Sequence, residues 1–227
     1  MKILNILSLL FLLVFATNCT RKYFKASDID EKTAPHKMVA ILPFEVEMQG
    51  RMPKNWDEQK KKEVLESESE MFQRSLINCI LRSSNNRRGN FKVSFQSIDK
   101  TRAVLIENGY NHESLKNKDP QELAKLLGVD AVFKVKLRKQ RYLSDAASFG
   151  ISKGIEVLQS TGNLPGIIPG RATRTNDINI DGSLINAENG EVLYSFSDRC
   201  GAHWNRPPEY IVEQVNGRIA RRFPYRK

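Results

Sequence analysis

The sequence has few of the residues that enzymes most often use for chemistry. Its three histidines, His36, His112 and His203, lie far apart, and its three cysteines do not stand at the spacing of a metal site. Cys200 precedes His203 by three positions, but nothing in the sequence orients that pair. The motifs G-x-x-x-x-G-K-[ST] and H-E-x-x-H are absent. The sequence therefore predicts no catalytic residue, no metal and a protein that is not an enzyme.

Long apolar runs are also scarce, and the one that occurs lies at the amino terminus. Residues 3–16 are apolar except for Asn5 and Ser8, and Lys2 precedes them. A run this short is typical of a secretory signal peptide, because a helix that spans a bilayer needs roughly 20 apolar residues. We therefore predict that residues 1–18 are a signal peptide and that the rest of the chain is exported.

The apolar run leads to Cys19, and this boundary resembles a bacterial lipobox, in which the cysteine thiol is diacylated after export. Ala16, Thr17 and Asn18 replace the usual Leu-Ala/Ser-Gly/Ala, as in the relaxed lipobox of Bacteroidota and some spirochaetes. The resemblance implies a diacylglycerol and a fatty acyl chain on Cys19, with no other cofactor. It also implies a position at the cell outer membrane. The periplasmic side is favoured because no acidic export signal follows the cysteine; inner-membrane anchoring and an ordinary secretory signal are the alternatives.

The formal net charge is +10, with many basic residues near the carboxyl terminus. Because an exported protein does not normally meet nucleic acid, we expect anionic lipid, peptidoglycan or an acidic protein face as the partner. We predict an anionic-surface contact on the last helix, to which Phe223 and Tyr225 add apolar contact; a merely solvated face is the alternative. The residues of the predicted contact are Arg218, Arg221, Arg222, Arg226 and Lys227.

The pattern of apolar residues predicts one α+β domain over residues 38–223, preceded by a lipidated tether at 19–37 and followed by a basic tail at 224–227. The expected order is β-α-β-α-α-β-β-β-α, a twisted mixed sheet packed by helices. The expected strands are 38–42, 91–95, 129–138, 178–184 and 192–196, and the expected helices are 57–82, 99–109, 120–128 and one that starts at 207–208.

Helix 120–128 carries the clearest local signals. Asp119 is the expected N-cap, Pro120 takes the first helical position, Glu122 completes a capping-box pattern and Gly128 ends the helix. Asp99 is expected to cap the preceding helix.

Two further expectations concern the sheet and the cysteines. One face of strand 129–138 is expected to be wet and cationic, as in an antiparallel sheet with one buried face. Cys79 lies among apolar residues at helical spacing and is expected in the core, although Cys79 and Cys200 could pair in an oxidising compartment.

Three segments, in this order, resemble a family of bacterial envelope proteins. They are residues 39–44 (VAILPF), 123–132 (LAKLLGVDAV) and 186–195 (NAENGEVLYS). Behind the lipobox, the set resembles the superfamily of periplasmic lipoproteins that includes the curli-secretion protein CsgG, the penicillin-binding-protein activator LpoB and the TolB amino-terminal domain. The resemblance spans roughly residues 38–198 and implies the fold of that superfamily. The motifs are structural, so they carry over no activity.

The predicted function is that of a lipid-anchored, non-enzymatic envelope lipoprotein that assembles with or regulates a cell-envelope complex. Its predicted partners are the membrane and either an envelope protein or a second copy of the chain. One alternative is a subunit of an oligomeric outer-membrane secretion channel of the curli-secretion type, and another is a hydrolase. Residues 143–175 bear on the channel, because Pro165 and Pro169 in this flexible insert oppose membrane-spanning strands.

Overall fold

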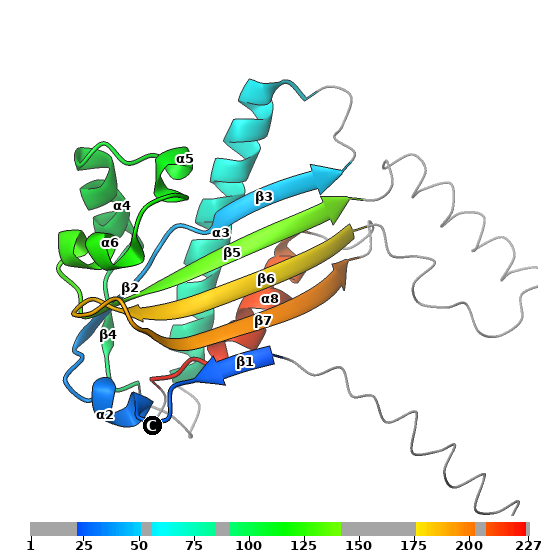
Figure 1. Ribbon diagram of the computed structural model, residues 1–227. Helices are drawn as coiled ribbons and strands as arrows, with labels where there is room; N and C mark the ends of the chain where they lie inside the picture. The colour runs from blue at the N-terminus through cyan, green and yellow to red at the C-terminus, as the bar shows by residue number, and fades with distance from the viewer. Residues whose placement is uncertain (1–21, 51–55, 85–90, 142–175, 203–207, 226–227) are drawn as a thin grey trace, which may run out of the picture.

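The computed structural model describes residues 22–50, 56–84, 91–141, 176–202 and 208–225. These residues form one mixed β-sheet with two long helices against one face and a group of short helices against the other face at one end (Figure 1). The predicted α+β class, with a twisted mixed sheet packed by helices, is therefore confirmed.

The sheet has seven strands in the order β1-β7-β6-β5-β2-β4, and β3 pairs with β5 beside this path. The three longest strands, β5, β6 and β7, are antiparallel neighbours, whereas β2 and β3 run parallel to β5. The bounds are β1 (Lys22–Lys25), β2 (Met38–Ile41), β3 (Glu45–Gly50), β4 (Ser94–Phe95), β5 (Ala131–Arg141), β6 (Asn176–Asn186) and β7 (Val192–Ala202).

β5 is the central strand, and it has two successive partners along one edge. Its beginning pairs with β2, and its second half, from Lys136 to Arg141, pairs with β3. The chain leaves β2 as expected near Pro43, but it then re-enters the sheet as β3, which the sequence analysis did not predict. Val46 is buried within this short strand while Glu47 is only partly buried, so only one face of β3 contributes to the core.

The larger core lies between the sheet and helices α3 (Glu58–Ser84) and α8 (Pro208–Ala220). α3 agrees with the predicted helix 57–82, and Phe72, Leu76 and Ile80 of its apolar stripe are at most 1% exposed. The Phe72 ring stacks on that of Phe44, with centroids 5.7 Å apart. Burial of such side chains typically contributes about 1.5–3 kcal/mol each, so this face supplies much of the stability.

A second, smaller core lies on the opposite face of the sheet, beneath α4 (Ile98–Glu107), α5 (His112–Leu115) and α6 (Pro120–Leu127). β2 serves both cores because its side chains alternate: Val39 and Ile41 enter the first, and Ala40 the second.

The ends of these short helices correct two predictions. Ser97, not Asp99, caps α4, since the Ser97 side chain accepts from the backbone N–H of Lys100 while Asp99 pairs with Arg74 on α3. Asp119 caps α6 as predicted, but its carboxylate accepts from Gln121 N–H, and no reciprocal bond from Glu122 is formed among the described residues. Gly128 ends α6 at φ +65°, as predicted.

The predicted tether at 19–37 is wrong from Lys22 onward. Residues 22–25 form β1 against the edge of β7, and α2 (Ile29–Lys32) follows, with Ile29 only 1% exposed. A strand of four residues shows no periodicity in sequence, because its order comes from the partner strand.

The carboxyl terminus departs from prediction in a similar way. α8 ends at Ala220, and Phe223 and Tyr225 are 2% and 1% exposed instead of facing a headgroup layer. Phe223 packs edge-on against Phe133 at 4.9 Å, and the Tyr225 hydroxyl lies 2.6 Å from Nδ1 of His36. The predicted tail at 224–227 is therefore packed into the fold as far as Tyr225; residues 226–227 lie outside the described part.

Candidate functional site

The sequence-predicted site residues are only partly within the described structure. Cys19, Arg226 and Lys227 lie outside it, as does the insert 143–175. Arg218 is in the last turn of α8, where it pairs with Asp198 of β7 at 3.3 Å. Arg221 and Arg222 follow the helix and are exposed.

Two exposed aromatic residues lie on β1, at the edge of the sheet (Figure 1), and a third, Tyr210, lies on α8. Tyr23 is 67% exposed and Phe24 is 51% exposed, which is unusual for large apolar side chains. Successive residues of a strand point to opposite faces, so these two rings flank the sheet edge on both sides. Burial raises the pKa of Tyr194, with opposing influences from Arg222, which lowers it, and Tyr23, which raises it; both side chains therefore lie near Tyr194.

We name Tyr23, Phe24, Arg221 and Arg222 the β1 surface. It combines aromatic rings with cationic groups, the composition that favours the water-facing layer of a membrane. Sequence reasoning placed the aromatic part at Phe223 and Tyr225, because helical spacing was extended past Ala220, where the helix ends.

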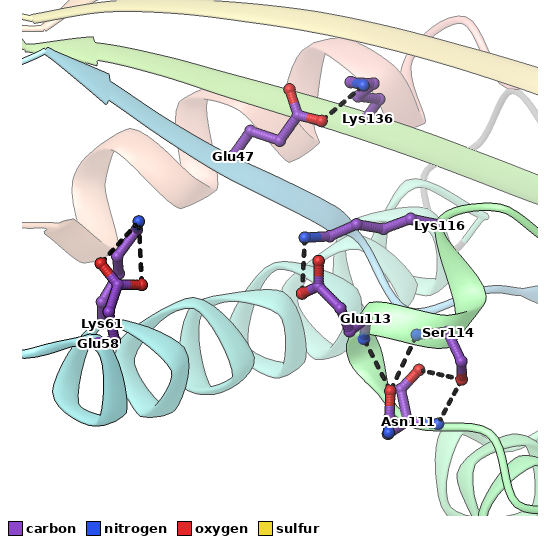
Figure 2. A network of polar contacts seen from close by, with 8 residues as sticks. All are labelled: Glu47, Glu58, Lys61, Asn111, Glu113, Ser114, Lys116 and Lys136. Atoms are coloured by element: carbon purple, nitrogen blue, oxygen red, sulfur yellow. Dashed lines mark hydrogen bonds and ion pairs between the residues drawn. The ribbon is translucent and has the colours of Figure 1, made fainter.

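The exposed face of β5 is not cationic, contrary to prediction. Lys134 pairs with Glu45 and Lys136 with Glu47, both at 2.7 Å, and Figure 2 shows the second pair between β5 and β3. Arg138 pairs with Asp181 on the neighbouring strand β6. Acidic side chains of the flanking strands therefore compensate the basic row, which sequence patterning within one strand could not reveal.

A cavity of about 310 Å³ lies at the other side of the sheet from β1, between α3, α4 and α5. Pro43, which follows β2, contributes to its wall, together with the apolar side chains of Leu105, Ile106 and Leu115. Ile106 is 68% exposed, so one apolar group of the wall is open to solvent.

Two polar groups of this cavity have no hydrogen-bond partner. Ser69 of α3 is 1% exposed and its Oγ is unpaired, and Nε2 of His112 on α5 is buried and unpaired. Burial lowers the pKa of His112, so its imidazole is neutral at pH 7. Arg102 in the wall is paired with Glu70 at 3.3 Å.

The α5 side of the cavity is fixed by a capping box. Asn111 Oδ1 accepts from the N–H groups of Glu113 and Ser114 at 3.0 and 2.9 Å, and the Asn111 N–H donates to Ser114 Oγ at 2.9 Å (Figure 2). Lys116 pairs with Glu113 at 3.0 Å beside it. No role was predicted for His112 from the sequence, because its neighbours in space come from distant segments.

No cluster of three or more His, Cys, Asp or Glu side chains among the described residues has the arrangement of a metal site. Cys79 and Cys200 are both buried and not bridged to each other, so the alternative disulfide is not formed. None of the described helices is both long enough and apolar enough to cross a membrane.

One short motif lies outside the described part. Residues 150–154 (GISKG) match the pattern G-x-S-x-G that surrounds the nucleophile of many serine hydrolases. The pattern is short and acquires this meaning only in a strand-to-helix turn with a histidine and an acid nearby. The hydrolase alternative is therefore best tested at Ser152.

No protein-family model and no curated protein matches the sequence. Among solved structures, the chain is similar to the PelC dodecamer from Paraburkholderia phytofirmans, at 8% identity and TM-score 0.41, covering 88% of this chain and 93% of that one. It is similar to lipoprotein GNA1162 from Neisseria meningitidis, at 11% identity and TM-score 0.41, covering 82% and 94%. It is also similar to the LpoB C-terminal domain from Salmonella enterica, at 9% identity and TM-score 0.37, covering 77% and 99%. Likenesses at this level assign neither a family nor an activity.

Proposed function

We propose that the chain is a lipid-anchored, periplasm-facing envelope lipoprotein that is not an enzyme and that assembles with or regulates a cell-envelope complex. Cys19, in its relaxed, Bacteroidota-like lipobox, is the proposed site of the diacylglycerol and fatty acyl chain. Two or three acyl chains anchor a protein stably, whereas one is marginal. The outer membrane is the proposed location, and the partner is an envelope protein or another copy of this chain.

The observation that carries the proposal is the position of β1. Lys22, the first residue of β1, follows Cys19 by three positions, so an extended chain spans at most about 10 Å between them. The polar layer on each side of a bilayer is itself about 5–7 Å thick. An acylated Cys19 would therefore hold the β1 edge of the sheet at the headgroups, without a long tether.

The β1 surface suits this position. Tyr23 and Phe24 have amphipathic or apolar rings exposed to solvent, and Arg221 and Arg222 are exposed cationic residues, of which Arg222 lies close to Tyr194, as Tyr23 does. Basic residues at an anionic membrane surface contribute about 1 kcal/mol each, within a screening length of about 8 Å at physiological salt. Under this proposal, the smaller core and the cavity at the opposite side of the sheet face away from the membrane.

The proposal is tested by vesicle binding of the chain without residues 1–19. We expect binding to vesicles that contain phosphatidylglycerol, and weaker binding as salt rises. Arg221→Glu with Arg222→Glu should weaken it by at least about tenfold, and Tyr23→Ser with Phe24→Ser should weaken it further. Ile106→Ser with Leu126→Ser is the matched control, because these exposed apolar residues lie on α4 and α6. Circular dichroism checks that each variant is folded; equal binding by all variants would contradict the proposed orientation.

A further inference from the structure

The cavity between α3, α4 and α5 contains two polar groups whose burial is not compensated by hydrogen bonds. Ser69 Oγ and His112 Nε2 are both buried, and neither has a partner. Leaving such a group unpaired costs more free energy than a hydrogen bond normally contributes, so an unpaired buried group in a folded protein calls for a partner. Both residues line the same cavity. The two atoms are covered from solvent in the empty protein, so a bound molecule pairs with them only when the Ser69 hydroxyl and the His112 ring turn toward it.

The size and walls of the cavity limit what it can hold. A volume of about 310 Å³ is at the lower end of the range for small-molecule sites, roughly 300–1,000 Å³, so a nucleotide or large cofactor is not expected. Leu105, Ile106 and Leu115 provide apolar walls suited to a branched aliphatic group. The occupant therefore needs an apolar part of the size of one or two side chains.

The charges around the cavity favour a neutral occupant. The positive charge of Arg102 is already paired with Glu70, and Glu66 adds a negative charge to the wall. An anionic ligand would meet uncompensated negative charge here. The free nitrogen of a neutral imidazole can form one hydrogen bond, and so can a hydroxyl. An amide group needs two such partners, one for its N–H and one for its C=O.

We propose that this cavity binds one apolar side chain, together with its adjoining peptide group, from a segment of a partner protein. The side chain packs against Leu105, Ile106 and Leu115, and the peptide group exchanges hydrogen bonds with Ser69 and His112. This inference deepens the proposed function by naming how the partner is recognised. Its test does not use the lipid anchor, so its failure is separate from failure of the membrane proposal.

The experiment is a titration of the chain without residues 1–19, in solution and without lipid, with N-acetyl-leucine N-methylamide. This probe has one branched side chain between two peptide groups. Methyl and imidazole resonances are recorded by NMR for the leucines, isoleucines and histidines. We expect saturable shifts confined to Leu105, Ile106, Leu115 and His112, with a Kd on the order of millimolar for a probe of this size. N-acetyl-glycine N-methylamide, which lacks the side chain, should bind at least about tenfold more weakly.

Variants separate recognition from folding. Ser69→Ala removes an unpaired hydroxyl, so the empty protein should melt at the same or a higher temperature, while affinity for the leucine probe falls at least about fivefold. Ile106→Ala should also lower affinity, whereas Leu126→Ala on the neighbouring helix α6 should not, although Leu126 is also partly exposed.

Three results would overturn the proposal. They are the absence of shifts at tens of millimolar probe, shifts spread over residues outside the cavity, and unchanged affinity in Ser69→Ala together with Ile106→Ala. The first of these would mean that only water satisfies Ser69 and His112.

Discussion

The ring of Phe196 limits the size of the residue at position 182 of β6. A Cβ atom on Gly182 would lie 2.2 Å from Cε1 of Phe196, on the neighbouring strand β7. The Phe196 ring stacks on that of Phe133, with centroids 6.3 Å apart, and contacts that of Tyr194, with centroids 6.2 Å apart. Gly182 is therefore required by the space that Phe196 occupies.

Gly182→Ala should lower the free energy of unfolding by about 1–3 kcal/mol, because the partly buried Phe196 ring must shift from its place against the core. Gly217→Ala is the control: a Cβ there meets nothing within 4 Å, and alanine favours the helix α8 by about 0.5–1 kcal/mol. Urea denaturation measures both. Equal effects of the two substitutions would contradict the described packing of Phe196.

His36 makes stability depend on pH. It is 7% exposed, and burial lowers the pKa of its imidazole below the usual value of about 6.5. In the unfolded chain His36 takes up a proton as the pH falls through about 6.5, whereas in the folded chain it resists protonation. The unfolded state then binds more protons, so stability is fully present above that pH and declines below it. His112, whose pKa burial also lowers, acts in the same direction.

We therefore expect the urea concentration at the unfolding midpoint to decrease as the pH is lowered from 7.5 to 5. This interval lies above the range where carboxylates titrate. His36→Gln should reduce this fall while leaving the part due to His112. A midpoint that stays constant or rises over this interval in the unmodified chain would show that neither histidine is buried as described.

Among the helices, α6 begins at an N-cap formed by the carboxylate of Asp119. Asp119 accepts from the Gln121 N–H at 3.0 Å, and Pro120 takes the first helical position, where it needs no hydrogen bond. Asp119→Ala should lower the free energy of unfolding by about 1 kcal/mol. Glu122→Ala should change it by less than half of that, since Glu122 does not complete the capping box. Thermal unfolding of both variants measures these losses of stability. Equal losses would indicate that Glu122 does form the capping box expected from the sequence.

The helices and strands also show which parts of the fold can be predicted from the sequence. Strands with repeated alternation, such as residues 131–138, and the long amphipathic helix α3 were predicted closely, because their pattern repeats several times. β1 and β3 were missed because each is short and takes its order from a distant partner strand, β7 or β5. β4 was predicted longer than it is, because only Ser94 and Phe95 pair with β2, whereas the Lys92 N–H donates to the Tyr225 carbonyl at 3.1 Å.

The candidate site was less predictable than the fold for the same reason. Arg221 and Arg222 could be predicted as exposed from charge alone, but the position of Arg222 near Tyr194 and Tyr23 depends on β1 pairing with β7. The cavity joins α3, α4 and α5, whose contacts span some forty residues of sequence. Ser69 and His112 carry no motif that would connect them before the helices are packed.

At the scale of the whole molecule, the sheet has two sides with different proposed roles. One edge, β1, lies three residues from Cys19 and exposes aromatic rings. The helices α4 and α5, whose residues line the cavity, lie away from β1 (Figure 1). The ion pairs between β3, β5 and β6 leave the sheet face between them balanced in charge. The proposed membrane contact and the proposed partner contact would therefore not compete for one surface.

The hydrolase alternative is tested at this scale as well, with the purified full chain and generic ester substrates. We expect no turnover above that of Ser152→Ala, because the GISKG pattern at residues 150–154 is then only a coincidence of composition. Turnover that Ser152→Ala abolishes would instead make the protein a hydrolase and contradict the proposed non-enzymatic role.

The proposed function depends on lipid at Cys19, which metabolic labelling with radioactive palmitate measures. Cells that express the chain should incorporate label into it and keep it in the membrane fraction, and Cys19→Ala should abolish both the label and the membrane retention. Label that persists in Cys19→Ala, or an unmodified chain that takes up none, would contradict the account.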